Sequence, residues 1–512
     1  MARLLQATGT MAAPLPADSS QPPPPPKGPR SISIWQPQES PQGLVFERPE
    51  PGPLGDHFAA VRTLRPKQGY LPRRICFFGE SVAAGYLYAP HLTPARLLEH
   101  QLREIAGPDA WDVVDLARTN ETLGSLAATV EASLQLSPDL LVIFAGNNWT
   151  LLETPEVSPY VPSVQARQEV AAALRAEGLL GPARLARQRL ALRAEAALSA
   201  IAVRAREAKI PVVLVVPEVN LLDWETRQPA AWLPGDGTAR WHAAYVRGQA
   251  ALEREDWPAA ESSAGEMVDL DGGTCPTPFR LLARALLGQG READTRDACI
   301  SEIDATHTPL LAFLAAPQAG TAAREILART AARHGWAAVD LREVFADWTG
   351  SHLPGRRLFL DYCHLTAEGM QVAMAAAAEQ VLRAIGQDAP AWRFLLTQTS
   401  FFPAVPPEAE ATARLGAALH SAHRLVAVTP KAPLLAHWCR EALAASPRIA
   451  GAFLDLAEMR AAPGPAVLTA AQRRNHGSPY RLLLQHGLRW EGLDADVLEA
   501  AREALAECGH PK

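Results

Sequence analysis

The amino-acid sequence predicts an α/β fold in which helices cover both faces of a central parallel sheet, forming a three-layer sandwich. Short apolar runs recur along the chain, as expected for strands that are buried on both faces. Stretches with helical periodicity separate these runs, as expected for the crossovers that join parallel strands. A helical insertion and a helical C-terminal extension are predicted in addition to this core.

The predicted strands are short, and each is followed by a turn or a loop. They cover residues 75–78, 113–116, 140–144, 211–216 and 337–341. A helix is predicted after the first strand, with Leu97, Leu98 and Leu102 facing inward. Further helices are predicted over about residues 123–136 and 321–333. This alternation of strand and helix is typical of a parallel sheet with helices on both faces.

The chain has 512 residues, which is long enough for a substantial core and for additional structural units. Residues 1–70 are rich in Pro, Gly and Ser and are predicted to be a disordered, solvated tail. The core is predicted in two parts, residues 71–237 and residues 306–390. A helical insertion over residues 238–305 separates them, and residues 391–512 are predicted to form the helical C-terminal extension.

The insertion contains a weak internal repeat. Gly248 and Ala260 are twelve residues apart, as are Ala283 and Thr295, and the two pairs are offset by 35 residues. This spacing resembles two degenerate tetratricopeptide-like helix pairs, while an ordinary four-helix insertion explains it equally well. We expect the insertion to leave the carboxyl edge of the sheet, to lie beside or over the pocket and to offer a surface for a protein partner.

Composition and charge argue against several classes of function. The net charge of −6 gives no indication of a basic patch, so no nucleic-acid partner is expected. The six cysteines form no CxxC pair, so neither a zinc nor a redox centre is predicted, and no metal or other cofactor is implied. The absence of a long apolar run and of a secretory signal predicts a cytoplasmic protein without a membrane span.

Candidate functional residues follow the predicted strands, at the edge of the sheet where open α/β folds bind ligands. Ser81 follows the first strand, Asn120 the second and Asn147 the third. Asp361 and His364 stand together near the end of the core, just before a predicted helix. The sequence therefore places a hydroxyl, an imidazole, a carboxylate and two amides near one edge of one sheet.

These residue types are the ones that nucleophilic catalysis needs. A serine hydroxyl such as that of Ser81 becomes a good nucleophile only when a base takes its proton. His364 is the candidate base, and Asp361, three residues away, is placed to hold the imidazole in the correct tautomer. The side-chain amide of Asn147 is a candidate donor to the oxyanion. The backbone N–H groups of Ser81 and of Asn120, a residue type that tolerates a left-handed conformation, would complete the oxyanion hole.

The chain resembles the SGNH, or GDSL-type, hydrolases, which carry Ser, Gly, Asn and His in four separate blocks. Residues 79–81 (GES) resemble the first block, residues 146–148 (GNN) the third, and residues 361–364 (DYCH) the last, with its DxxH spacing. Asn120 stands where the second block has glycine, with Gly124 as the alternative. Glu and Asn replace the usual Asp of the first and third blocks. The resemblance covers less than half of the chain.

This resemblance implies an SGNH-hydrolase-like sandwich and an ester hydrolase or acyltransferase that works through an acyl-enzyme. The substrate would be a small-molecule or carrier-linked O-acyl ester or a related ester. Ala83 stands where a GxSxG motif would need glycine, which argues against the α/β-hydrolase elbow. The alternative is a catalytically degenerate protein of the same fold that presents its helical insertion to a partner, and the replacements in the blocks leave it open.

Four further residues are candidates for binding the substrate. Asn148 and Trp149 follow the third block, while Arg356 and Arg357 precede the DxxH segment. An arginine there can hold a carboxylate or phosphate by a bidentate contact. The more common fate of such arginines is an exposed pair with acidic residues.

Each catalytic motif also has a purely structural explanation when it is taken alone. A serine after a strand can cap the next helix, a DxxH pair can be a cap followed by a surface histidine, and two asparagines can form a turn. The motifs nevertheless occur in the order that a hydrolase site requires, behind predicted strands. The catalytic interpretation is therefore the one that the sequence favours.

Overall fold

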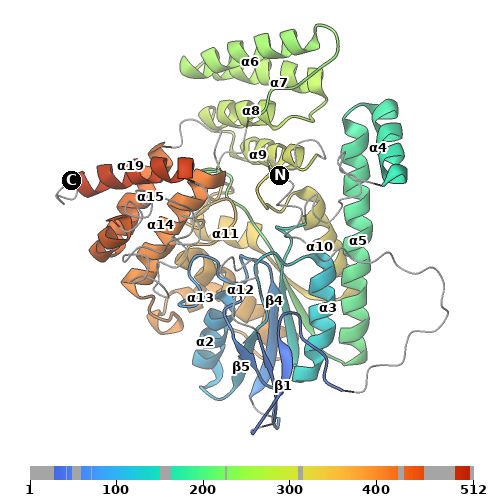
Figure 1. Ribbon diagram of the computed structural model, residues 1–512, viewed down its shortest axis with the longest axis vertical. Coiled ribbons are helices and arrows are strands. Elements are labelled where there is room, and N and C mark those ends of the chain that lie inside the picture. The colour runs from blue at the N-terminus through green and yellow to red at the C-terminus, as the bar shows by residue number, and fades with distance from the viewer. Residues whose placement is uncertain are drawn as a thin grey trace.

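The structure is a computed structural model. It describes residues 28–41, 43–48, 59–70, 72–149, 163–224, 228–308, 315–424, 432–454 and 491–507. A five-stranded parallel sheet with helices on both faces forms the centre of the molecule, which confirms the predicted α/β class (Figure 1). The order of strands along the sheet is β5-β4-β6-β7-β8.

The strands of this sheet lie within two residues of the predicted positions. They are β4 (Arg73–Gly79), β5 (Trp111–Asp115), β6 (Leu140–Phe144), β7 (Val212–Val216) and β8 (Ala337–Asp340). Every residue of β6 and β7 is buried, as expected for central strands covered on both sides. The parallel pairing places Phe77 opposite both Asp115 and Val142, so the carboxyl ends of β4, β5 and β6 meet at one edge.

Two layers of helices enclose the sheet (Figure 1). One layer contains α2 (Pro94–Ala106) and α12 (Ala367–Ala384), which contact each other. The other contains α3 (Leu123–Ser133), α5 (Leu180–Glu207) and α10 (Thr321–His334), in which α5 contacts both of its neighbours. Shorter elements continue these layers; they are η1 (Leu134–Leu136), α4 (Val164–Glu177) and α11 (Leu341–Thr349).

Local sequence explains where α2 begins and which face it buries. The Thr93 side chain accepts a hydrogen bond from the Arg96 N–H, and proline occupies the first helical position, where no donor is needed. Leu97, Leu98 and Leu102 are fully buried, as predicted from their spacing. At roughly 1.5–3 kcal/mol for each buried leucine, this face anchors the helix to the sheet.

The prediction of a disordered tail over residues 1–70 is wrong for the residues that the structure describes there. An antiparallel sheet of β1 (Gln36–Ser40), β2 (Gly43–Glu47) and β3 (Thr63–Leu64) lies in this segment. Trp35 and Phe46 are fully buried in the main core, and Trp35 Nε1 donates to the Val61 carbonyl at 3.1 Å. The Pro-rich composition of the whole segment concealed these few large apolar side chains.

The insertion consists of four antiparallel helices. They are α6 (Gly237–Glu253), α7 (Trp257–Asp271), α8 (Pro276–Gly288) and α9 (Glu292–Thr306). Each helix contacts the next, and α6 also contacts α8. A Cβ atom at Gly248 would lie 2.5 Å from Leu281 Cδ2, so glycine permits the close approach of α6 and α8. Figure 1 shows these helices beyond the sheet end where β4 finishes, the edge that we predicted.

The C-terminal region is helical, as predicted. Its described elements are α13 (Trp392–Leu396), η4 (Thr399–Phe401), α14 (Pro407–Arg424), α15 (Ala432–Ala445), η5 (Pro447–Ile449) and α19 (Glu491–Glu507). Leu415 and Leu419 of α14 are fully buried in the same hydrophobic core as the central sheet. The region is therefore integrated with the core. None of the helices in the described part of the chain is long and apolar enough to cross a membrane.

Candidate active site

The edge of the sheet between β4 and β6 carries the residues that the sequence assigned to catalysis. The chain leaves β4 toward β5 on one side and later returns to β6 on the other side. Such a reversal opens a crevice at the carboxyl ends of the strands, and ligands bind there in open α/β folds. Ser81 follows β4 and Asn147 follows β6, so the two residues flank the reversal.

Ser81 lies just after a point of very close contact between β4 and β6. A Cβ atom at Gly79 would lie 2.0 Å from the Phe144 carbonyl oxygen and 2.4 Å from Ala83 Cβ. Only glycine avoids these clashes, and it allows the chain to turn sharply at the end of the strand. The turn places the Ser81 side chain at the sheet edge.

The segment after Ser81 differs from the helix that we expected to begin there. Residues 81–91 form a series of overlapping turns, and the first regular helix begins later. Gly85 and Leu87 have φ angles of 67° and 78°, and these left-handed conformations interrupt helical hydrogen bonding. Ser81 therefore does not stand at the N-terminus of a regular helix.

Ser81, His364 and Asp361 form an unbroken chain of hydrogen bonds. His364 Nε2 lies 2.8 Å from Ser81 Oγ, within the range of a functional general base. His364 Nδ1 lies 2.7 Å from Asp361 Oδ2. Ser81 is half-buried, while His364 and Asp361 are only 2% and 1% exposed. An aspartate that accepts from Nδ1 leaves Nε2 of the neutral imidazole free to accept the serine proton.

Hydrogen bonds within the loop and from Asn220 hold the loop that carries Asp361 and His364. Asp361 Oδ1 accepts hydrogen bonds from the backbone N–H groups of Cys363 and His364, at 3.0 and 2.9 Å. Asn220, which follows β7, donates its side-chain amide to the Asp361 carbonyl at 3.0 Å. The Asn220 N–H donates to the Tyr362 carbonyl at 3.0 Å. These contacts fix the position of the loop.

Asp361 is ionised despite its burial. Loss of hydration alone would raise its pKa, but the two histidines that contact the carboxylate, His364 and His420, outweigh burial and lower the pKa far below its ordinary value. A stable negative charge is therefore present beside His364. Such a charge stabilises the imidazolium that forms when His364 takes a proton.

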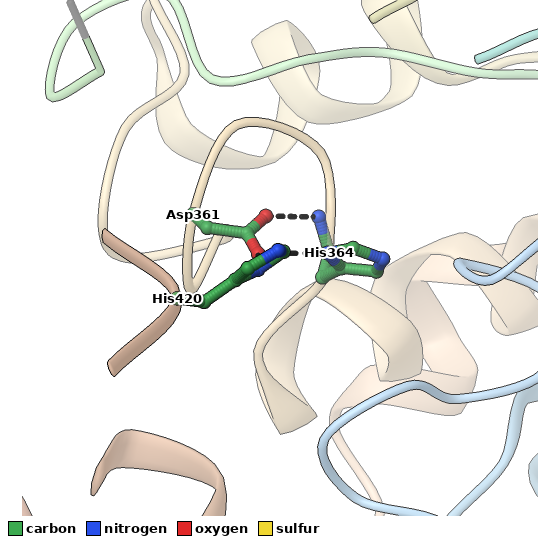
Figure 2. Close-up of side chains that lie close together, drawn as sticks. All are labelled: Asp361, His364 and His420. Atoms are coloured by element: carbon green, nitrogen blue, oxygen red, sulfur yellow. Dashed lines mark hydrogen bonds and ion pairs between the residues drawn. The ribbon is translucent and has the colours of Figure 1, made fainter. Parts of the chain in front are cut away.

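His420 is the member of this cluster that the sequence did not reveal. It lies on α14, and its Nδ1 is 2.7 Å from Asp361 Oδ2, the same oxygen that His364 contacts (Figure 2). Tyr86 and Tyr362 each lie against both imidazole rings, with centroid separations between 4.8 and 5.7 Å. A single histidine on a buried helix face gives no sequence signal that distinguishes it from an ordinary core residue.

The same three residues, Asp361, His364 and His420, are also of the types that bind transition metals, and their ligand atoms lie within 4.8 Å of one another. Ligands of a tetrahedral zinc ion at about 2.0–2.1 Å stand roughly 3.3 Å apart. Each Nδ1–Oδ2 separation here is 2.7 Å, the length of a charge-assisted hydrogen bond. The geometry therefore fits a hydrogen-bonded cluster better than a zinc cage.

Asn147 is oriented so that its amide NH₂ group remains available as a donor. Its Oδ1 accepts a hydrogen bond from the Ala319 N–H at 3.0 Å, which determines the orientation of the amide. The residue is only 2% exposed. Glu80 holds the surrounding loop, because its two carboxylate oxygens accept from the N–H groups of Gly146 at 3.1 Å and Asn148 at 3.0 Å.

The other residues predicted for the oxyanion hole, and Asn148 and Trp149, which were predicted to bind the substrate, lie in different surroundings. Asn120 has a φ angle of 57°, which is the left-handed conformation expected for the residue that replaces glycine. Gly124 lies within α3, away from the turn that follows β5. Asn148 donates its side-chain amide to the Glu121 carbonyl at 3.1 Å, and Trp149 is 2% exposed. Asn148 therefore joins neighbouring loops, which gives its amide a structural role.

Arg356 and Arg357, predicted as possible substrate anchors, are both paired with acidic side chains. Arg356 contacts Asp223 at 2.9 Å, and Arg357 contacts Glu368 at 2.7 Å. The two arginines are 40% and 55% exposed. Both arginines therefore form surface ion pairs with acidic residues, the more common arrangement for such residues.

A buried ion-pair cluster connects the insertion to the same edge of the sheet. Glu218, which follows β7, is paired with Arg296 of α9 at 2.5 Å and with Arg324 of α10 at 2.6 Å. Burial raises the pKa of Glu218, but the two arginines outweigh it and lower the pKa overall. Arg324 also donates to the Ala319 carbonyl at 3.2 Å, next to the N–H that holds Asn147.

Comparison with known proteins gives no independent assignment of this site. No protein-family model, no curated protein and no solved structure matches the chain.

Proposed function

We propose that the protein is a serine-nucleophile ester hydrolase or acyltransferase that acts through an acyl-enzyme on an O-acyl or related ester. The observation that carries this proposal is the continuous contact from Ser81 Oγ to His364 Nε2 and from His364 Nδ1 to Asp361, at 2.8 and 2.7 Å. A serine that only capped a helix would have no reason to meet a buried imidazole that is itself held by an ionised carboxylate.

The geometry supports a two-step mechanism. Ser81 Oγ attacks the ester carbonyl carbon while its proton passes to His364 Nε2, and Asp361 stabilises the resulting imidazolium. The carbonyl oxygen becomes an oxyanion, which the Asn147 amide and the backbone N–H groups of Ser81 and Asn120 would bind. His364 then protonates the departing alkoxide and leaves an acyl group on Ser81. Water or an acceptor alcohol, deprotonated by His364, releases the acyl group and regenerates the hydroxyl of Ser81.

We further propose that the core is an SGNH-hydrolase-like sandwich. Three features support this: the serine follows the first parallel strand, an asparagine with an available amide follows the third, and DxxH precedes α12. Asn120 in a left-handed conformation supports its equivalence to the glycine of the second block. Glu80 reaches two backbone N–H groups of the third block, so its carboxylate holds that block in place despite the change from aspartate.

A fluorophosphonate probe tests the proposal directly, because it forms a covalent bond only with an activated serine. The wild-type protein should be labelled and should hydrolyse a short-chain nitrophenyl ester. Ser81→Ala should lose the label and nearly all activity. Ser125→Ala is the matched control, because Ser125 is also half-buried but contacts Thr122 and Glu121. This control should keep its label.

Failure of the folded wild-type protein to be labelled would overturn the enzymatic proposal. That result would favour the alternative, a degenerate fold that presents the helical insertion to a protein partner. If labelling succeeds, adding an acceptor alcohol to the ester assay distinguishes the two reactions. An acyltransferase forms the transfer ester at the expense of free acid, whereas a hydrolase continues to release the acid.

A further inference from the structure

We propose that His420 is a positioning residue of the catalytic triad, supplied by the C-terminal helical region. The inference rests on the proposed function, because it assigns a role to a group that acts through Asp361 and His364. It makes α14 part of the catalytic centre, although the helix lies outside the segments that resemble a hydrolase. The C-terminal region would then be required for full activity.

The hydrogen bonds around Asp361 form the basis of this assignment. Oδ1 accepts two backbone N–H groups, from Cys363 and His364, and Oδ2 accepts from His364 Nδ1 and His420 Nδ1. The carboxylate is therefore held by four donors from two separate parts of the chain. With Oδ1 held by the loop itself, the contact from His420 fixes the direction in which Oδ2 faces His364.

Sharing Oδ2 also has an electrostatic consequence. Each hydrogen bond to a carboxylate oxygen withdraws negative charge from it, so a second imidazole donor weakens the pull of Asp361 on the His364 proton. His364 then returns its proton more readily to a leaving group. Removing the His420 donor would leave more negative charge on Asp361 Oδ2 and strengthen its pull on the His364 proton. Among the residues that the structure describes, Asp361 contacts both imidazoles, and Tyr86 and Tyr362 lie against both rings.

Packing holds α14 in the position that this role requires. A Cβ atom at Gly416 would lie 2.8 Å from Leu87 Cδ2, so α14 lies tightly against the turns that follow Ser81. One turn later on the same helix, His420 is 6% exposed and its ring contacts both Tyr86 and Tyr362. The helix therefore contacts the turns after Ser81 as well as the loop that carries Asp361.

The test compares two substitutions of His420 by the rate of fluorophosphonate labelling across pH. His420→Leu removes the donor and should slow labelling about 10–100-fold, the range found when an outer-shell partner of a functional histidine in a metal site is lost. It should also move the acid limb of the pH profile, which is the fall in labelling rate toward low pH, to higher pH. His420→Asn places an amide N–H close to the position of Nδ1 and should restore most of the rate and the original limb.

The control is His437→Leu, the same substitution at a half-buried histidine of the neighbouring helix α15. It should change neither the rate nor the pH profile. A folded His420→Leu protein with the wild-type rate and profile would overturn the positioning role while leaving the proposed function intact. Equal losses in the Leu and Asn variants, without a shift of the acid limb, would also overturn it, because they would indicate packing alone. Stoichiometric zinc in the purified wild-type protein, absent from His420→Leu, would instead identify a metal centre.

Discussion

Replacing Asn147 separates its proposed catalytic role from its structural role, because its two ends have different partners. The Oδ1 atom accepts from the Ala319 N–H at 3.0 Å, while the NH₂ group is left to donate to an oxyanion. Asn147→Ala removes both functions. Asn147→Asp keeps an acceptor for Ala319 but replaces the donor by an oxygen. A comparison of the two variants therefore assigns each loss to one end of the side chain.

The expected magnitudes follow from these two contacts. Loss of one oxyanion donor lowers turnover by roughly 10²–10³-fold, or about 2.7–4 kcal/mol of transition-state stabilisation. Asn147→Ala also leaves the Ala319 N–H without its partner, which should lower the free energy of unfolding by about 1–3 kcal/mol. Asn147→Asp should lose at least as much activity, because its carboxylate repels a developing oxyanion. Its stability should remain closer to that of the wild type where the introduced carboxyl group is protonated, because ionising a buried carboxyl group costs stability.

The assay combines steady-state ester hydrolysis from about pH 6 to about pH 9 with thermal unfolding of the same preparations. Burial raises the pKa of an introduced carboxyl group, so the Asn147→Asp variant should lose more activity as pH rises and the group ionises. The Asn147→Ala variant should follow the wild-type pH profile at a lower level. If Asn147→Ala retained the wild-type turnover, the amide would only hold the loop, and the oxyanion assignment would be wrong.

Two buried carboxylates give further predictions. Burial raises the pKa of Asp115 from 3.8 to about 7. The folded state therefore has its full stability below about pH 4 and loses part of it as the pH rises to about 7 and Asp115 ionises. Asp115→Asn should show a smaller fall in unfolding temperature between about pH 5 and about pH 8 than the wild type. Glu218→Gln leaves Arg296 and Arg324 without their buried anion. In a denaturant titration it should lower the free energy of unfolding by about 3–5 kcal/mol. A loss below about 1 kcal/mol would show that solvent compensates the two arginines for the missing carboxylate.

The strands and the residues at their ends could be predicted because both depend on short, local patterns. Continuous apolar runs mark strands that are buried on two faces, and the carboxyl ends of parallel strands meet at one edge. Asp361 and His364 are three residues apart, so a single turn brings them together. The contact between Ser81 and His364 spans 283 residues, and the sequence indicated it only through the order of the motifs.

The features that the sequence did not reveal depend on tertiary contacts. His420 is 59 residues from Asp361 along the chain, and the pattern of α14 indicates a buried face without indicating its partner. The left-handed Leu87 could not be anticipated, since leucine rarely adopts that conformation. Trp35 and Phe46 were overlooked because the composition of a long Pro-rich segment, taken as a whole, hides a few large apolar side chains.

Three buried carboxylates explain how segments so distant in sequence make one site. Glu80 joins the end of β4 to the loop that carries Asn147, Glu218 joins the end of β7 to α9 and α10, and Asp361 joins the histidine loop to α14. Each is at most 2% exposed, and each accepts hydrogen bonds from at least two different donors. A buried carboxylate is costly unless such donors surround it, so folding is favourable only when the loops reach these positions. The candidate donors and base are thereby held in fixed positions, which is the condition that the proposed function requires for stabilising charge that develops in a transition state.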